Sequence, residues 1–287
     1  MFEGFTRKQI KTSGATINLV QGGTGAPLLL LHGYPETHVC WHLVAPTLAE
    51  RFTVVCSDLR GCGDSSKPES DSDHFNYSKR AMAQDQVEVM QTLGFEKFVV
   101  VGHDRGARVA HRLALDHQER ITKLALLDII PTSAAFELVD KEMVTAAFNW
   151  FFSIQPDDLP ERMIGSESTF YLQWLLDHWA GKKGALANEA VAEYRRCFDA
   201  EMIRATCEEF RAAASIDLTH DQIDKDRRIS CPTFVLWSAT SMWARHNILE
   251  LWRARADDVT GSALECGHFL PEEDPEQTAT ELIRFIS

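Results

Sequence analysis

Short apolar runs alternate with longer stretches of helical spacing along most of the chain. This alternation predicts repeated βαβ units and therefore a parallel sheet. The runs are apolar at every position, as in LLLL and FVVV, which is typical of strands that helices cover on both faces. We expect strands at residues 15–20, 27–32, 53–58, 97–102, 123–128 and 233–237, and a short strand near Ala263.

The block between Asp128 and Pro232 breaks this alternation. It carries few strand signals and several helical ones, such as KEMVTAAFNWFF, TFYLQWLLDHW, NEAVAEYRRCF and MIRATCEEFRAAA. We interpret the block as a helical lid over the carboxyl ends of the strands, where sheets of this kind bind their ligands. The predicted fold class is α/β, with a core domain of residues 1–130 and 229–287 and a lid of residues 131–228.

Composition and charge narrow the class of protein. The chain has 287 residues, 45% of them hydrophobic, which is enough for one large core. A net charge of −13 would repel the backbone of a nucleic acid, and no apolar run is long enough to span a bilayer. Seven cysteines form no CxxC pair, which argues against a disulfide framework and against a zinc site. We therefore expect a cytoplasmic protein that binds neither nucleic acid nor membrane.

The stretch FVVVGHDRGARVAHR, residues 98–112, predicts a strand, a sharp turn and a helix, with Asp104 at the tip of the turn. A carboxylate is a weak nucleophile, but its product with an sp3 carbon is an ordinary ester, so Asp104 suits displacement of a halide or opening of an epoxide. The start of a helix favours the ionised carboxylate. The alternative is that Asp104 only caps the helix; the two glycines around it and a downstream Gly-His turn favour the nucleophile.

Three motifs occur in the order expected of the α/β-hydrolase fold: LLLLHGYP at residues 28–35, GHDRG at 102–106 and CGHFLPEE at 266–273. The chain resembles that superfamily over nearly its whole length. Within it, an aspartate nucleophile is shared by haloalkane dehalogenases, soluble epoxide hydrolases and haloacetate dehalogenases. The run GHDRGARVAHR, together with LLDIIPT at 126–132, resembles most the haloacetate dehalogenase group, whose members include the fluoroacetate dehalogenases.

The resemblance implies that His268 is the general base that activates water to hydrolyse the aspartyl ester. A third group must hold the imidazole in the right tautomer. The stretch SATSMWARH after Trp237 contains no carboxylate, whereas the strand before the lid ends in Asp128, so we expect Asp128 to be that group. The alternative is that Asp128 is a turn residue before Pro131.

Two arginines follow the nucleophile, and residues i and i+3 at a helix start can point toward one spot. Arg105 and Arg108 then form a fork for a small anion. Arg105 stands where the resembled haloalkane dehalogenases and epoxide hydrolases carry tryptophan, which favours a 2-haloacid substrate, most simply a haloacetate. The alternative is that both arginines are solvated. The backbone N–H of Tyr34, in HGYP, is expected to face the oxyanion of ester hydrolysis.

The resemblance also implies a halide site made by a His-Trp pair and a tyrosine of the lid. The matching residues here are Asn149, Trp150 and Phe210. Trp150 keeps its indole N–H, the amide of Asn149 cannot carry charge, and Phe210 donates nothing. Fluoride needs donors most, because it is small and badly desolvated in an apolar pocket. We therefore predict that chloroacetate and bromoacetate are favoured over fluoroacetate.

Two other functions stay open. The first is a soluble epoxide hydrolase, in which Tyr171 and Tyr194 of the lid would donate protons to the opening epoxide. The second is a catalytically silent α/β-hydrolase that binds a small molecule. The main hypothesis requires no metal and no organic cofactor, and the resemblance implies a homodimer.

Overall fold

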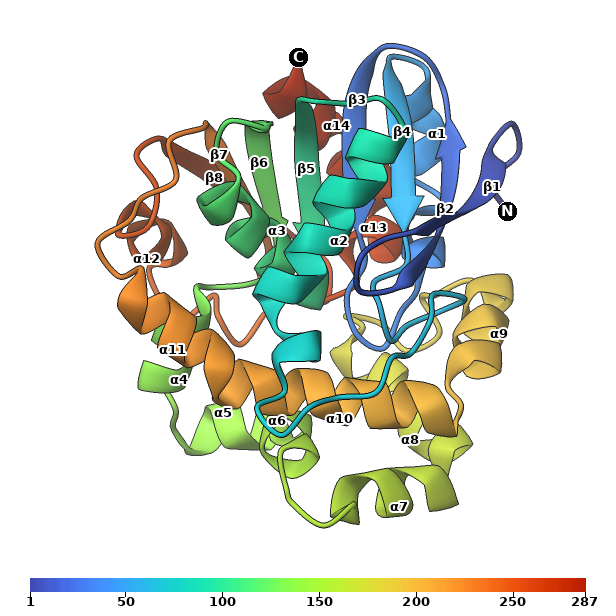
Figure 1. Ribbon diagram of the computed structural model, residues 1–287, viewed down its shortest axis with the longest axis vertical. Coiled ribbons are helices and arrows are strands. Elements are labelled where there is room, and N and C mark those ends of the chain that lie inside the picture. The colour runs from blue at the N-terminus through green and yellow to red at the C-terminus, as the bar shows by residue number, and fades with distance from the viewer.

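An eight-stranded sheet runs through the computed structural model, which describes residues 1–287 (Figure 1). The strand order is β1-β2-β4-β3-β5-β6-β7-β8. β1 pairs antiparallel with β2 and β2 antiparallel with β4, whereas all other neighbours are parallel. The strands are β1 Thr6–Lys11, β2 Thr16–Gly22, β3 Ala26–Leu31, β4 Phe52–Ser57, β5 Phe98–His103, β6 Ile121–Leu127, β7 Thr233–Ser238 and β8 Val259–Leu264.

The sequence analysis places seven of these strands but not β1. Residues Leu28–Leu31 of β3 and Val100–Val101 of β5 are fully buried, as the continuous apolar runs predict. β1 reads TRKQIK, and only Ile10 of it is buried. An exposed edge strand carries charged side chains and no apolar run, so the hydrophobic pattern contains no signal for it.

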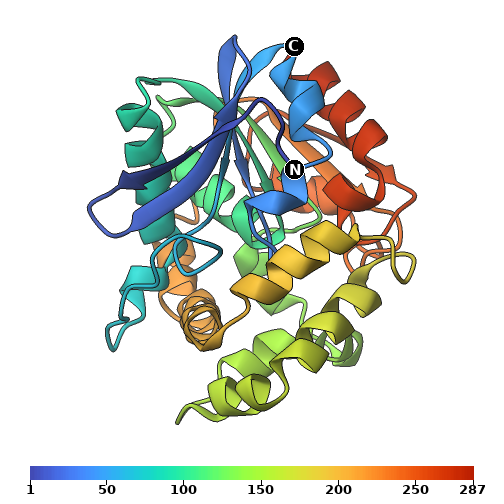
Figure 2. The same ribbon diagram turned by 90° about the vertical axis from the view of Figure 1, so that its right-hand side faces the viewer.

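Helices cover both faces of the sheet. Figure 2 shows α2 (Lys79–Thr92) and α3 (Asp104–Asp116) on one side, with α1 (Ala45–Ala49) and α14 (Pro275–Ile286) on the other. The strands between them are shielded from water on both faces, and the α/β fold class is confirmed. The remaining short helices of the core are η1 His38–Trp41, η2 Phe75–Tyr77, α12 Ile248–Arg253 and α13 Leu270–Glu273.

Eight helices follow one another between β6 and β7 and pack across the end of the sheet at which β5 passes into α3 (Figure 1). They begin at Thr132 and end at Ile223, so they fall inside the range 131–228 that the sequence analysis assigns to the lid. They are α4 Thr132–Glu137, α5 Lys141–Ala146, α6 Phe148–Ser153, α7 Leu159–Ser166, α8 Ser168–Trp179, α9 Asn188–Cys197, α10 Ala200–Ala214 and α11 Ile216–Ile223.

Candidate active site

The turn from β5 into α3 holds Asp104 in a backbone conformation that non-glycine residues rarely adopt, with φ of 45°. Glycines on either side make this turn possible. A Cβ on Gly102 would collide with the backbone of Gly106, and a Cβ on Gly106 would collide with the backbone at Leu31 and His32. The strained turn lifts the carboxylate above the end of the sheet, as the motif predicts.

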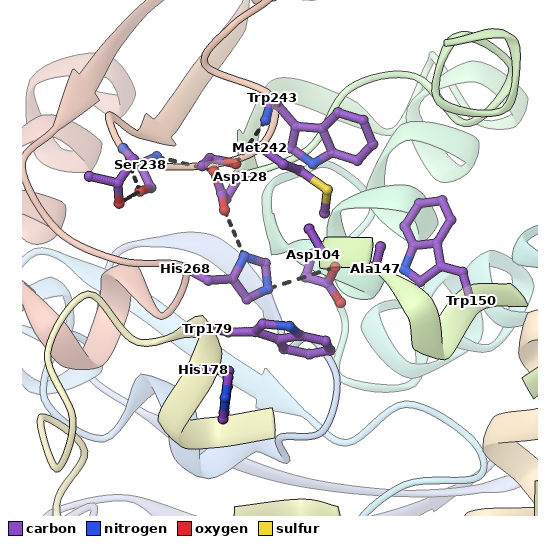
Figure 3. Close-up of a pocket in the computed structure, with 13 residues that line it drawn as sticks. Asp104, Asp128, Ala147, Trp150, His178, Trp179, Ser238, Met242, Trp243 and His268 are labelled. Carbon is purple, nitrogen blue, oxygen red and sulfur yellow. Dashed lines mark hydrogen bonds and ion pairs between the residues drawn. The ribbon is translucent and has the colours of Figure 1, made fainter. Parts of the chain in front are cut away.

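Three predicted residues from three separate segments meet at this point (Figure 3). His268 Nδ1 lies 2.6 Å from Asp128 Oδ2, and Asp128 Oδ1 accepts a hydrogen bond from the Ser238 backbone N–H at 3.1 Å. His268 Nε2 lies 3.8 Å from Asp104 Oδ2. This separation is too long for a hydrogen bond, so the Oδ2 atom of Asp104 is not tied to the imidazole. Asp128, with φ of 52°, stands in a strained turn of its own.

The charges of the site keep Asp104 ionised. Burial alone would raise its pKa, but His268, His103 and the two following arginines together bring that pKa below its usual value. The pKa of His268 is raised to about 9, because the hydrogen bond and the charge of Asp128, with the charge of Asp104, outweigh the effect of burial. In the resting site the imidazole is therefore paired with carboxylates on both sides.

The HGYP turn places a backbone donor on the other oxygen of the nucleophile. The N–H of Tyr34 donates to Asp104 Oδ1 at 3.1 Å. The two carboxylate oxygens thus face different partners: Oδ1 faces a backbone amide, and Oδ2 faces the imidazole across an open gap. Such an amide is suited to stabilise negative charge on Oδ1.

The two arginines are buried rather than solvated, each with an exposed fraction of 2%. Arg105 donates through Nε to Glu209 Oε1 at 2.8 Å and through Nη2 to the Glu209 carbonyl at 3.2 Å, and its Nη1 has no partner. Arg108 donates through Nη1 to Thr132 Oγ1 at 2.8 Å, and its Nε and Nη2 have no partner. Burial and then the neighbouring Arg105 lower the pKa of Arg108 to about 10, so the Arg108 guanidinium is charged at neutral pH.

Glu209 was not identified from the sequence, although it directly precedes Phe210. Its carboxylate accepts from Arg105 and lies 2.9 Å from Lys79 Nζ, and Lys79 in turn lies 3.3 Å from Asp217 Oδ2. All four side chains are buried. The lid thereby supplies the counterion for one arginine of the catalytic helix. The only sequence signal is a charged residue inside an otherwise apolar helix face, which is too common to single out.

His103, directly before the nucleophile, was also missed. Its Nδ1 lies 2.8 Å from Glu36 Oε2, and its Nε2 lies 2.7 Å from the backbone carbonyl of His268. A carbonyl oxygen only accepts, so Nε2 carries a proton. Glu36 also accepts the Gly33 N–H at 3.2 Å. This buried chain of contacts ties the HGYP turn, the nucleophile strand and the loop of the general base together.

A cavity of about 180 Å³ opens beside the nucleophile. Figure 3 shows Asp104 between His268 and Trp150, with Trp179 on one side and Met242 and Trp243 on the other. Trp150, which the sequence analysis expects at the halide site, therefore lines the cavity beside the nucleophile. It also stacks on Arg108, whose guanidinium carbon lies 4.6 Å from the ring.

The other two residues of the expected halide site do not line this cavity. Asn149 is fully buried, and neither its amide nitrogen nor its amide oxygen has a hydrogen-bond partner. Phe210 packs against Arg105, with the guanidinium carbon 4.0 Å from the ring centre. Its ring lies 6.4 Å from that of Trp150, so the two aromatic rings and the two arginines form one cluster behind the cavity.

The tyrosines of the epoxide hydrolase alternative do not form a matched pair. The Tyr194 hydroxyl donates to Glu272 Oε2 at 2.8 Å and is therefore engaged within the protein. Tyr171 stacks on Phe198, and its hydroxyl has no partner. Neither tyrosine lines the cavity beside Asp104.

The family model that describes the alpha/beta hydrolase fold matches residues 26–275, which is most of the chain. The chain belongs to the α/β-hydrolase fold family. A solved α/β-hydrolase structure from Nostoc sp. PCC 7120 superposes with a TM-score of 0.99 at 56% identity, covering 100% of this chain and 99% of that one. This likeness extends through both the sheet and the inserted helices.

Two relatives with named activities are similar to this chain over nearly its whole length. A fluoroacetate dehalogenase of Burkholderia sp. is 44% identical over 100% of this chain and 95% of its own length. A soluble epoxide hydrolase of Corynebacterium sp. strain C12 is 32% identical over 98% of this chain and 97% of its own length. The expected resemblance to the dehalogenase group is confirmed, and epoxide hydrolases are more distant relatives.

The side chains and helices of this α/β-hydrolase can also be compared with what a metal site and a membrane span require. No group of three or more histidine, cysteine, aspartate or glutamate side chains is arranged to hold a metal ion. None of the helices combines the length and the apolar character needed to cross a membrane.

Proposed function

We propose that this protein is a hydrolytic dehalogenase that converts a haloacetate to glycolate and halide through an ester on Asp104. One observation carries the proposal: a carboxylate nucleophile stands beside two buried guanidinium groups that keep unpaired N–H donors, at Arg105 Nη1 and at Arg108 Nε and Nη2. Buried charged donors without partners are costly unless an anion occupies the site. A substrate with its own carboxylate supplies that anion.

In the first step, the arginines hold the substrate carboxylate so that its C2 atom stands in line between Asp104 Oδ2 and the halogen. Oδ2 forms a bond to C2 while the bond from C2 to the halogen breaks, and the halide leaves with the bonding electron pair. The product is an ester between Asp104 and a glycolyl group. Trp150 supplies an indole N–H on the leaving side, and Asn149 is expected beside it.

In the second step, His268 takes a proton from water, and the hydroxide attacks the carboxyl carbon of Asp104. The negative charge develops on Oδ1, which already accepts the N–H of Tyr34. The bond from the carboxyl carbon to the glycolate oxygen then breaks, and glycolate leaves with the proton from His268. Asp128 stabilises the imidazolium in between.

Formation of the ester also lowers the pKa of the general base, His268. In the resting enzyme the charge of Asp104 is one cause of the raised pKa of His268. Esterification removes that charge, so the pKa of His268 falls at the moment when an unprotonated imidazole is needed.

Two measurements test this function. Single turnover in heavy-oxygen water should place the label in Asp104, detected by mass spectrometry of its peptide, because the water attacks the aspartyl carbon. An active enzyme with unlabelled Asp104 would refute the ester. Halide release should be compared across fluoro-, chloro- and bromoacetate, with Asp104→Asn as the control. We expect chloroacetate and bromoacetate to be favoured; equal or faster release from fluoroacetate would contradict the expected weakness of the halide site.

A soluble epoxide hydrolase is the second candidate, supported by the unpaired hydroxyl of Tyr171 and by the Corynebacterium relative. A styrene-type epoxide in the same assay decides between the two. A non-catalytic binding protein would release no halide and form no diol. The seven unpaired thiols support a reducing, cytoplasmic location, and the homodimer rests on the family resemblance alone.

A further inference from the structure

Glu273 belongs to the motif CGHFLPEE, but the proposed mechanism gives it no role. It ends α13, the short helix that follows the general base. Its carboxylate accepts three backbone N–H groups: those of Gly267 at 3.1 Å and Gly181 at 2.7 Å on Oε2, and that of Phe269 at 3.0 Å on Oε1. Hydrogen bonds to a carboxylate are stronger than those between neutral groups, so these three bonds hold the backbone firmly.

Two of the three N–H groups lie on either side of His268. Gly267 precedes it and Phe269 follows it, so one carboxylate holds both neighbours of the general base. The N–H of His268 itself donates to the Trp179 carbonyl at 2.9 Å. Every backbone N–H from Gly267 to Phe269 is therefore bonded, and the point from which the imidazole side chain starts is fixed.

The third N–H comes from the lid. Trp179 ends α8, and Gly181 follows shortly after it. Gly181 approaches Gly267 so closely that a Cβ on either glycine would collide with the backbone of the other. The Trp179 ring stands edge-on to the imidazole of His268, 5.7 Å between centroids, and it lines the cavity beside the nucleophile (Figure 3). Glu273 thus joins the loop of the general base to the part of the lid that forms one wall of the cavity.

The position of the imidazole has little tolerance. Its Nδ1 lies 2.6 Å from Asp128 Oδ2, and its Nε2 lies 3.8 Å from Asp104 Oδ2. In the second step the attacking water must stand between Nε2 and the carboxyl carbon of Asp104. A displacement of about 1 Å in such an arrangement can cost on the order of 100-fold in rate. The bond to Asp128 orients the ring, and the backbone of the loop has to be held separately.

We propose that Glu273 is a positioning residue for the general base: its three backbone bonds fix the imidazole of His268 where ester hydrolysis requires it and tie that position to the lid through Gly181. This inference rests on the proposed dehalogenation. Glu273 does not line the cavity, so it acts through His268 rather than on the substrate.

The two steps of the proposed reaction separate this role from general support of the fold. Formation of the ester uses Asp104 and the two arginines, which stand on α3, and none of the three N–H groups belongs to that helix. Hydrolysis of the ester needs His268. Loss of the bonds to Glu273 should therefore slow hydrolysis while ester formation continues, whereas a general loss of structure slows both steps together.

The first variant is Glu273→Gln, studied with chloroacetate by rapid quenching. The amide keeps one acceptor oxygen and presents its NH2 group to a backbone N–H, so at least one of the three bonds is lost. We expect ester hydrolysis to slow by about 10- to 100-fold, with a burst of chloride close to one equivalent per site and an ester on Asp104 that peptide mass spectrometry detects. Glu276→Gln makes the same chemical change at an exposed position of α14 and should leave both steps unchanged.

A second variant disturbs the same contact from the lid. Gly181→Ala places a methyl group 2.6 Å from the backbone nitrogen of Gly267 and should push the lid and the loop of the base apart. We expect the same accumulation of ester as in the first variant. Gly165→Ala is the matched control, because a methyl group there has open space around it. It should leave the rates of both steps unchanged.

A measurement without substrate reports on the imidazole directly. The proton on His268 Nδ1 lies in a 2.6 Å charge-assisted bond to Asp128. It should give a downfield proton NMR signal that is absent from His268→Gln. Both test variants should broaden or weaken this signal, because the loop that carries the imidazole is released, whereas both control variants should retain it.

The outcomes separate this inference from the function on which it rests. If the wild type turns over chloroacetate and Glu273→Gln slows both steps equally, or neither step, the positioning role is refuted and the dehalogenase stands. An unchanged signal of the His268 proton in Glu273→Gln and Gly181→Ala also refutes it. If the signal changes in both variants but no haloacetate reacts with the wild type, the link between Glu273 and the base stands and the proposed dehalogenase fails.

Discussion

The strand side and the lid side of the candidate site differ in how their polar atoms are paired. On the strand side, His268 contacts Asp128, Asp128 contacts the backbone of Ser238, and Asp104 accepts from Tyr34 before any substrate arrives. On the side that faces the lid, which we call the lid side, donors of Arg105 and Arg108 and both ends of the Asn149 amide have no partner.

In the proposed mechanism, the paired groups carry out the reaction and the unpaired groups recognise the substrate. The groups proposed to make and break bonds are held in place by one another, so their geometry does not depend on the substrate. The groups proposed to select the substrate are buried with unpaired donors, and a ligand with matching charge and acceptors offsets the cost of burying them. Substitutions on the strand side should therefore affect kcat, whereas substitutions on the lid side should affect binding and leaving-group preference.

The largest expected effect is on the strand side. Asp104→Asn removes the nucleophile and should lower halide release on the order of 10⁴-fold or more. His268→Gln should instead stop at the ester and release one equivalent of halide per site, since only the second step needs the base. Peptide mass spectrometry detects the trapped ester. Multiple turnovers by His268→Gln would show that hydrolysis of the Asp104 ester does not need His268.

The second effect is on the stability of the lid attachment. Glu209→Ala leaves Arg105 buried without a counterion and leaves Lys79 with Asp217 alone, and should cost about 3–5 kcal/mol, measured by urea unfolding. Glu201→Ala, at an exposed position on the same helix, is the control and should cost less than about 1 kcal/mol. Equal small losses in both variants would show that the buried ion pairs do not hold the lid.

The third effect concerns how Arg108 recognises the substrate carboxylate. Arg108→Lys keeps the positive charge but loses the two unpaired fork donors. We expect kcat/KM for chloroacetate to fall about 10- to 100-fold, corresponding to about 1.5–3 kcal/mol for a hydrogen bond to a charged group. Chloroacetamide, which lacks the carboxylate, serves as the matched substrate and should be affected far less. A similar loss on both substrates would mean that Arg108 does not read the substrate charge.

The smallest effect is the pH dependence of turnover. His268 holds its proton up to a pKa of about 9 in the resting enzyme, and the ester lowers that pKa by removing the charge of Asp104. The base is active only without its proton. Turnover should therefore rise with pH, by at most tenfold per unit, and level off at or below about pH 9. A rate that falls over this range would exclude His268 as the base.

Much of the fold was predictable because its signals are local. Buried parallel strands need continuous apolar runs, and the GHDRG turn needs glycines where the backbone comes close to itself. The exposed strand β1 has no such signal, since most of its side chains face water. The positions of Asp104, Asp128 and His268 followed from the ends of strands, which a parallel sheet brings to one edge.

The partners of the arginines were not predictable in the same way. Glu209 meets Arg105 only because the folded chain brings α10 to the start of α3, and no rule of spacing links residues 104 positions apart. The chain from Glu36 through His103 to the His268 backbone likewise joins three distant segments. The sequence predicts that Arg105 and Arg108 bind the substrate carboxylate together, but it could not show that Arg105 already holds the buried carboxylate of Glu209.

The bond between Glu209 and Arg105 also limits how the protein can be rebuilt. Lids of α/β-hydrolases are natural targets for exchange between relatives, because they enter the chain at two neighbouring points of the sheet. Here the donor lid would have to carry an acidic residue at the place of Glu209, or the recipient core would have to give up Arg105 and Lys79 together. Lid and core therefore have to be exchanged together, because a chimera without this acidic residue leaves the guanidinium of Arg105 buried and unpaired next to the nucleophile.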